Sequence, residues 1–223
     1  MNGAPVKPPD SGPPRRPYQS AKRDAAALKT RYAIRDAAES LFLRDGYTRT
    51  SMKAIATQAG VSEKTMYLTY NTKANLLRHV IQVAVRGDEA PATLSERPEW
   101  RALMAGPIDE VFARFAARNA ALMTRTAPII ALAESAATTD PELAEHRDHA
   151  HATARADLHA LATEFKHRGA LASHISEQDA ADTLYAVANN VSVYLRLTTE
   201  CGWNDTRYAD LIARTLKATL AAR

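Results

Sequence analysis

The chain has 223 residues, of which 46% are hydrophobic and 24% are charged, and this length can bury a sizeable core. Charged residues interrupt every apolar run well before the ~18 residues that a membrane helix needs, and the first twenty residues lack the apolar segment of a secretory signal. A single cysteine, Cys201, excludes an internal disulfide and a cysteine-based zinc site and fits a reducing compartment. We therefore expect a cytoplasmic protein without a membrane span.

Charge is distributed unevenly along the chain. The formal net charge is +4, but residues 1–86 carry 15 Lys and Arg against 6 Asp and Glu, a local charge of +9, and residues 87–223 carry 14 against 19, a local charge of −5. Such asymmetry indicates that one region meets a polyanion while the other does something else. The alternative is a chance segregation of solvated charges.

The first 24 residues are basic and rich in proline, with six of the eleven prolines in the first seventeen positions. They lack apolar periodicity, so we expect a disordered arm. The rest is rich in alanine and has no alternating β-branched run, which predicts an all-α fold. The expected helices cover residues 25–44, 51–58, 62–69, 72–86, 97–105, 107–121, 126–136, 141–168, 177–200 and 205–221.

A helix-turn-helix pattern occupies about residues 50–69. Thr50 or Ser51 can cap a first short helix, Gly60 permits a tight turn, and Ser62 can cap a second short helix. Met66 is expected to face inward. The outer face then carries the polar or exposed side chains Glu63, Lys64, Thr65, Tyr67, Leu68 and Thr69. Side chains of this kind suit base edges and phosphates in a major groove, although a tight corner between helices can also be purely structural.

This region resembles the DNA-binding domain of TetR-family transcriptional regulators. The matching residues are Gly46-Tyr47, Ile55-Ala56, Ala59-Gly60-Val61-Ser62, Thr65-Met66-Tyr67, Thr72-Lys73 and Leu76-Leu77. The chain departs from the family after Tyr67, where Leu68 and Thr69 replace the usual His or Tyr and the aromatic is delayed to Tyr70. The resemblance covers about residues 28–85.

The resemblance implies an N-terminal three-helix helix-turn-helix domain at residues 25–86 and a larger helical effector-binding and dimerisation domain at residues 87–223. It implies phosphate contacts from Thr50 or Ser51, Tyr67, Thr69 and Lys73. The candidates for base readout are Glu63, Lys64, Thr65 and Leu68. Glu63 can equally be an acid that complements the helix dipole, and the arm can lie along DNA or be a solvated tail.

The last two expected helices carry apolar or small residues at helical spacing. These residues are Ala180, Leu184, Val187, Val191, Tyr194, Leu195, Tyr208, Leu211, Ile212, Thr215, Leu216 and Leu220. In the family the last helix pair packs against its copy, so we expect an exposed seam and a symmetric homodimer. The alternative is that both helices complete the core of one chain.

Aromatic, methionine and amide side chains in the C-terminal region are candidates for an effector pocket, or alternatively for the core. They are Trp100, Met104, Phe112, Phe115, Asn119, Met123, Phe165, Tyr185, Asn189 and Tyr194. His146, His149 and His151 lie close together after Pro141, where a solvated helix face is favoured over a metal site. We expect no metal and no cofactor. No catalytic spacing is present, so we do not expect an enzyme.

The sequence therefore predicts a homodimeric, sequence-specific DNA-binding transcriptional regulator. The favoured form is a repressor that a small-molecule effector releases from palindromic operator DNA. The alternative is a helical ligand-binding or protein-interaction module whose N-terminal corner is only structural.

Overall fold

The computed structural model describes residues 17–87 and 98–222, and it describes side chains for all of these except residues 17–24 and 99–101. Within these ranges the chain forms helices and turns, with one isolated β-bridge between Leu171 and Ala221 and no strand. The α-helices are α1 (Pro17–Asp45), α2 (Met52–Ala59), α3 (Glu63–Tyr70), α4 (Lys73–Arg86), α5 (Pro98–Ala105), α6 (Val111–Ala136), α7 (Pro141–His167), α8 (Glu177–Ala188), α9 (Val191–Leu195) and α10 (Asp205–Leu220). A short 3-10 helix, η1 (Ile108–Glu110), precedes α6, and a short π-helix, η2 (Arg196–Glu200), follows α9. The predicted all-α fold is confirmed.

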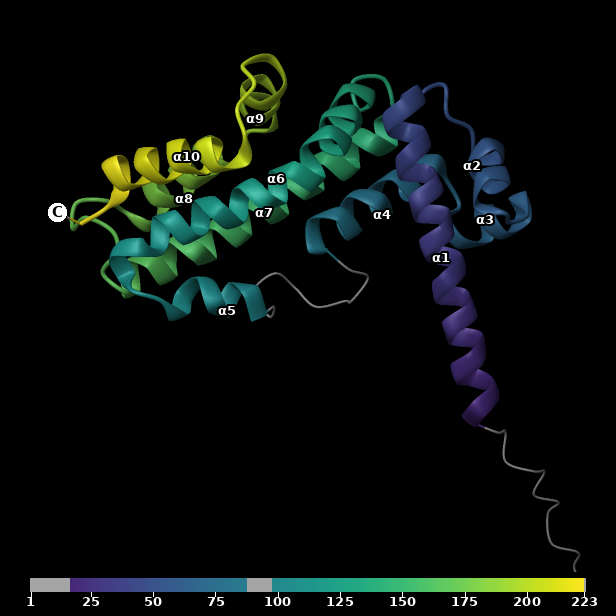
Figure 1. Cartoon of the computed structure of the whole chain (residues 1–223), viewed down its shortest axis with the longest axis horizontal. Coiled ribbons are helices and arrows are strands. Elements are labelled where there is room, and N and C mark those ends of the chain that lie inside the picture. The colour runs from purple at the N-terminus through teal and green to yellow at the C-terminus, as the bar shows by residue number, and fades with distance from the viewer. Residues whose placement is uncertain (1–16, 88–97, 223) are drawn as a thin grey trace, which may run out of the picture.

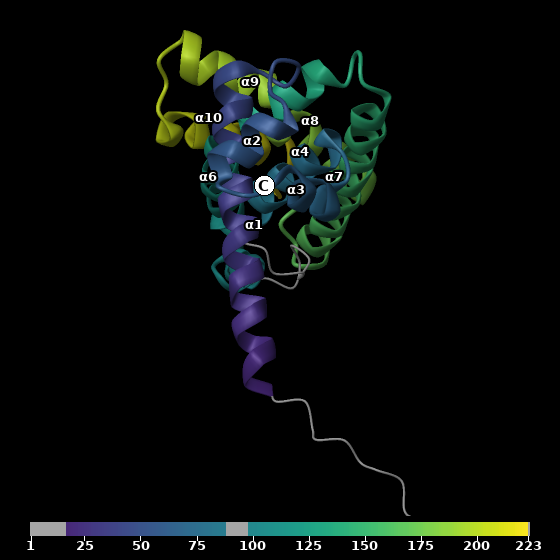
Figure 2. The same ribbon diagram turned by 90° about the vertical axis from the view of Figure 1, so that its right-hand side faces the viewer.

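Two long helices, α6 and α7, run side by side through the molecule, with α10 packed along α6 and α8 along α7 (Figure 1). The small helices α2 and α3 lie with α1 and α4 at one end. Turned by 90°, this end faces the viewer and α1 extends well beyond the other helices (Figure 2). The α1–α4 unit is thus presented at an end of the helical body.

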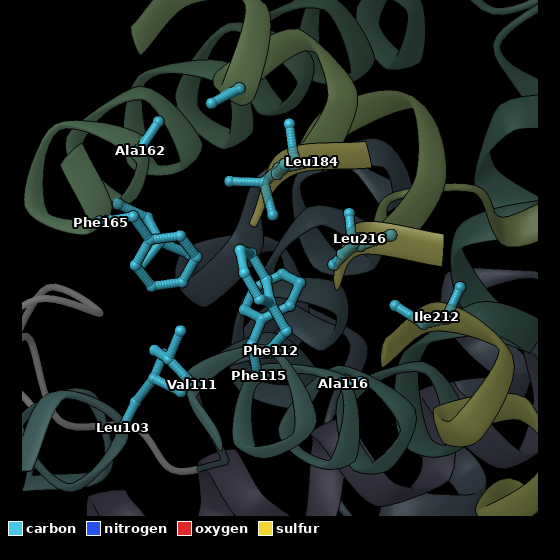
Figure 3. Packing of buried hydrophobic residues seen from close by; sticks show 14 of the residues in the cluster. Leu103, Val111, Phe112, Phe115, Ala116, Ala162, Phe165, Leu184, Ile212 and Leu216 are labelled. Atoms are coloured by element: carbon cyan, nitrogen blue, oxygen red, sulfur yellow. The ribbon is translucent and has the colours of Figure 1, made fainter. Parts of the chain in front are cut away.

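Two buried clusters form the core. One contains residues of all four helices α1, α2, α3 and α4. It is completed by Ile129 of α6, by Ala137 of the turn after α6 and by Leu143 of α7. The other fills the space between α6, α7, α8 and α10, where aromatic and aliphatic side chains face one another (Figure 3). Because residues of α6 and α7 enter the N-terminal cluster, the two parts of the molecule share packing.

Three helix boundaries differ from those expected. The helix α1 begins at Pro17, inside the segment expected to be a disordered arm, and the remainder of that arm, residues 1–16, lies outside the described residues. The expected helices 107–121 and 126–136 are one helix, α6, which continues through Pro128. Pro128 is exposed between the buried Ala127 and Ile129, so the missing backbone hydrogen bond lies on the solvent side.

The expected helix 177–200 is also broken. It ends at Ala188, and Asn190 starts α9 by accepting a hydrogen bond from Val193 N at 3.0 Å through its side-chain oxygen. Two consecutive asparagines compete with the backbone for hydrogen bonds, which favours a helix boundary here.

The expectation of an exposed seam on the last helices is wrong for most of its residues. Leu184, Tyr208, Ile212 and Leu216 are at most 2% exposed within a single chain, and they pack in the cluster shared with α6. Ala180, Val191, Tyr194 and Leu220 are also buried. Their apolar spacing therefore belongs to the core of one chain.

Candidate nucleic-acid interface

The α2–turn–α3 unit forms as the sequence predicts. Ser51 caps α2 by accepting a hydrogen bond from Ala54 N at 3.1 Å, and Ser62 caps α3 by accepting one from Thr65 N at 3.1 Å. Between them Gly60 adopts a φ of 67°, a left-handed conformation that costs glycine little. The turn that orients α3 is therefore determined by local side chains.

One face of α3 anchors the helix and leaves the other face to solvent. Met66 is fully buried and Tyr70 nearly so, in the same cluster as Ile55 and Ala56 of α2. A helix seated in this way holds its outer side chains in fixed positions. A surface that binds a rigid polymer such as DNA needs this property.

The outer face of α3 carries large exposed side chains. Leu68 is 78% exposed and Tyr67 is 51% exposed, which is unusual for an apolar and an aromatic residue on so short a helix. Glu63 and Lys64 are also exposed. Thr65 is half-buried, and its hydroxyl lies 2.8 Å from the Ser62 hydroxyl at the helix start. Of the four expected base-reading residues, Thr65 is thus the one turned toward the cap.

The expected phosphate-contacting residues fall into two groups. Tyr67, Thr69 and Ser51 are exposed, and Thr69 donates its hydroxyl to Thr65 O at 2.7 Å. Thr50, in contrast, is 2% exposed, and its hydroxyl lies 2.8 Å from Gly46 O and 3.2 Å from Leu41 O, where it fastens the loop between α1 and α2. Ser51 is therefore the member of the Thr50/Ser51 pair that solvent can reach.

Lys73 is directed inward at the start of α4. Its ammonium donates to Tyr47 O at 2.8 Å and to Thr50 O at 3.0 Å, and it lies 4.1 Å from the centroid of the Tyr47 ring. Burial lowers the pKa of Lys73, while nearby Asp140 raises it. In this structure Lys73 ties α4 to the loop before α2.

The N-terminal end of α4 is also bonded to the start of α7. Glu142 accepts a hydrogen bond from the Thr72 hydroxyl at 2.8 Å and from Asn75 Nδ2 at 2.9 Å. Beside it, the Tyr47 hydroxyl donates to Asp140 Oδ2 at 2.9 Å. Burial raises the pKa of Tyr47, and the hydrogen bond to Asp140 raises it further.

The opposite end of α4 is held by α6. The Arg125 guanidinium donates to Ala84 O at 2.7 Å and to Val85 O at 3.2 Å, two carbonyls of the last turn of α4. A carboxylate thus lies at the positive end of the α4 dipole and a guanidinium at its negative end. These contacts join residues 40 to 70 positions apart in the chain, so no local sequence pattern marks Glu142 or Arg125.

The residues expected to line an effector pocket lie mostly in the packed core. Phe165 meets Phe112 and Phe115 edge to face, with ring centroids 5.5 Å and 6.5 Å apart. Met123 is 1% exposed, and Asn119 donates Nδ2 to Ala188 O at 3.0 Å. Close packing and satisfied hydrogen bonds account for these positions without a ligand.

The remaining pocket candidates are dispersed. Tyr194 donates its hydroxyl to Asp205 Oδ1 at 2.9 Å, and the Tyr185 hydroxyl lies 2.5 Å from His151 Nδ1. Met104 is half-buried and Asn189 ends α8, whereas the side chain of Trp100 lies outside the described ones. Two surface hollows, one between α6 and α10 and one between α1, α3 and α4, contain none of the ten candidates.

The histidine cluster on α7 does not form a metal site in the structure. His146 Nε2 lies 3.8 Å from Glu142 Oε1, and no group of three or more His, Cys, Asp or Glu side chains in the described ranges is arranged to hold a metal ion. Among the same residues, no helix is both long and apolar enough to cross a membrane.

Comparisons with known proteins agree with this architecture. Residues 34–80 match the sequence profile described as bacterial regulatory proteins of the tetR family. No curated protein matches the chain.

Solved structures share the fold over most of the chain. NalD, described as the secondary repressor of the MexAB-OprM multidrug efflux pump in Pseudomonas aeruginosa, is 20% identical with a TM-score of 0.65, over 88% of this chain and 98% of NalD. A Mesorhizobium loti protein described as a TetR-family transcriptional regulator is 20% identical with a TM-score of 0.63, over 86% and 97% of the two chains.

A transcriptional regulator from Saccharomonospora viridis, solved in complex with choline, is 15% identical with a TM-score of 0.64, over 86% of this chain and 98% of that one. At these identities the structures establish the common fold, and the matched residues 34–80 lie within the α1–α4 unit. Residues 34–80 therefore match the N-terminal module of the TetR family of bacterial regulatory proteins, and the chain shares the fold of these solved regulators.

Proposed function

We propose that the protein is a homodimeric transcriptional regulator that binds operator DNA sequence-specifically through the outer face of α3. The observation that carries this proposal is the exposure of Lys64, Tyr67 and Leu68 on a helix whose opposite face is fully buried. A cation, a phenol and an apolar side chain suit base edges, phosphates and thymine methyl groups. The charge of +9 on residues 1–86 favours the approach of a polyanion.

A purely structural corner explains these residues less well. A corner that only completes a core has no need for a leucine that is 78% exposed beside an exposed tyrosine. The alternative, a ligand-binding or protein-interaction module whose N-terminal corner is purely structural, therefore leaves the composition of the α3 face without a reason.

Two-fold symmetry would place two α3 helices on successive half-sites of a palindrome, about 34–36 Å apart on one face of the duplex. Because the apolar spacing of α8 and α10 is used inside one chain, the dimer contact that we propose uses the outward side chains of these two helices. Regulation of transcription takes place where the DNA lies, which in a bacterium is the cytoplasm.

The regulatory outcome we propose is repression that a small molecule relieves. NalD is described as a repressor, and the Saccharomonospora viridis regulator is described in complex with choline, so both properties occur within this fold. An effector would act by binding the conformation that does not fit DNA more tightly than the one that does.

A gel shift tests the proposal. The full chain is titrated onto the DNA upstream of its own gene, and onto a mixed-sequence duplex, across a salt series. We expect tighter binding to the upstream DNA and a steep fall in affinity with salt on both. No shift of either duplex at low salt would reject DNA binding, and equal affinity for both would reject sequence-specific binding.

A further inference from the structure

The helix α1 extends beyond the part of the chain that resembles the family. It begins at Pro17, seventeen residues before the matched module, which starts at residue 34. Residues 17–33 contain Lys22, Arg23, Lys29 and Arg31 against a single acid, Asp24. Lys29 and Arg31 are exposed. The extension is therefore a basic helix that the three-helix module does not require.

The extension forms one wall of a groove beside α3. This α1/α3/α4 groove has a volume of about 680 Å³. Its lining includes Thr30 and Arg31 of α1, Thr65 and Thr69 of α3, and Arg78 and His79 of α4. Hydroxyl and cationic side chains thus come from all three helices. None of the described Asp or Glu side chains lines the groove.

Arg78 has unused hydrogen-bonding capacity in this groove. Its Nη2 donates to Asn75 Oδ1 at 3.1 Å, but its Nε is buried and finds no hydrogen-bond partner among the described residues. A buried guanidinium N–H without a partner is costly, and a bound anion would remove that cost. The groove thus has the chemistry of a phosphate site.

The position of the groove identifies the source of the phosphate. Thr65 and Thr69 belong to α3, the helix that we propose to enter the major groove. In a duplex bound to α3, a phosphate backbone runs along each edge of the DNA major groove, which is only about 12 Å wide. On the α1 side, α3 adjoins the α1/α3/α4 groove and the basic extension, where one of these backbones would pass.

We infer that the α1 extension and the α1/α3/α4 groove bind backbone phosphates of the DNA next to the half-site, with Arg31 and Arg78 as the main contacts. The inference rests on the proposed function and adds a second, sequence-independent contact to it. Phosphate contacts of this kind position a protein on DNA without reading its sequence.

The test measures how binding of the full chain to a mixed-sequence duplex depends on salt. The variants are Arg31→Gln, Arg78→Gln and the double variant, and Arg155→Gln is the matched control, because Arg155 is an exposed arginine on α7. The slope of log K against log [salt] should become shallower by about 0.9 for each lost phosphate contact. The control should keep the wild-type slope.

Arg78 is half-buried, so replacing it can destabilise the protein, and the folding of each variant is checked separately. Arg31 is exposed, so Arg31→Gln alone keeps the test decisive if Arg78→Gln is unstable, and Arg78→Lys should restore most of the slope. A wild-type slope in Arg31→Gln and in a folded Arg78→Gln would overturn the inference and leave the proposed function intact. Failure of the wild-type protein to bind any duplex would instead overturn the proposed function.

Discussion

The ammonium of Lys73 donates hydrogen bonds to two backbone carbonyls and lies over an aromatic ring, so its charge interacts with groups of the protein itself. The resemblance to the TetR family implies a phosphate ligand at this position. What the sequence does not contain is the position of Tyr47 and Thr50, whose carbonyls the fold brings to the ammonium. The sequence shows that a lysine stands at this position, but the direction of its side chain depends on tertiary structure.

Replacing Lys73 by Met should destabilise the protein by about 1–3 kcal/mol, because the carbonyls of Tyr47 and Thr50 would lose a charged donor. Urea unfolding gives the change in the free energy of unfolding. Lys53→Met on the exposed face of α2 is the control and should change it by less than about 0.5 kcal/mol. An unchanged stability together with weaker DNA binding would return Lys73 to the role of a phosphate ligand.

Tyr208 gives a prediction at alkaline pH. Burial raises the pKa of Tyr208 to about 12, from an ordinary value of about 10. Since the folded state favours the neutral phenol, this contribution is fully present below pH ~10 and is lost as pH rises toward ~12. Urea unfolding at a series of pH values should show a decline of about 2 kcal/mol from this group.

The variant Tyr208→Phe should remove that part of the decline, and Tyr67→Phe on the exposed face of α3 should not. If Tyr208→Phe loses stability between pH 10 and pH 12 as steeply as the wild type does, the buried phenol is not the responsible group.

At the scale of elements, α4 links the two parts of the molecule. Its first turn is bonded to α7 through Glu142, and its last turn is bonded to α6 through Arg125. A rearrangement of α7 therefore acts on the first turn of α4 and a rearrangement of α6 on its last turn, and α4 in turn packs against α1 and α3.

Replacing Glu142 by Ala should lower the free energy of unfolding by about 1–2 kcal/mol, because Thr72 and Asn75 would both lose an acceptor. Glu145→Ala, one turn further along α7 on the exposed face, is the matched control. Chemical unfolding of the two variants gives the comparison. Equal stability of the two would show that solvent replaces the α4–α7 contact at no cost.

Element boundaries show which features the sequence could predict. The helix starts at Ser51, Ser62, Thr72 and Asp140 were predictable, because a capping side chain and its backbone partner are only three residues apart. The continuation of α6 through Pro128 could not be predicted, because packing of α6 against α10 and α4 outweighs the backbone hydrogen bond that a proline removes from a helix. The core positions of α8 and α10 were assigned to a dimer seam, since periodicity does not distinguish burial by one chain from burial by two.

At the scale of the whole molecule, the unequal charge is the feature that connects sequence and structure. The segment with a charge of +9 contains the exposed face of α3, the α1 extension and the α1/α3/α4 groove. The acidic remainder forms the helical body that holds α4 at both ends. Candidate effector residues such as Phe112, Met123 and Phe165 are buried in the core of that body, so the sequence could identify apolar helix faces there but could not separate core from ligand site.

The central claim is that the outer face of α3 reads the DNA sequence. Footprinting of the DNA upstream of the protein's own gene tests this claim most directly, and it compares the wild-type protein with the double variant Lys64→Gln/Leu68→Ala. Both side chains are exposed, so the variant should fold normally. We predict that the wild type protects two half-sites related by two-fold symmetry, and that the variant loses this protection while keeping its salt-dependent binding to mixed-sequence DNA. Protection of the same half-sites by both proteins at the same concentrations would contradict a reading role for the outer face of α3.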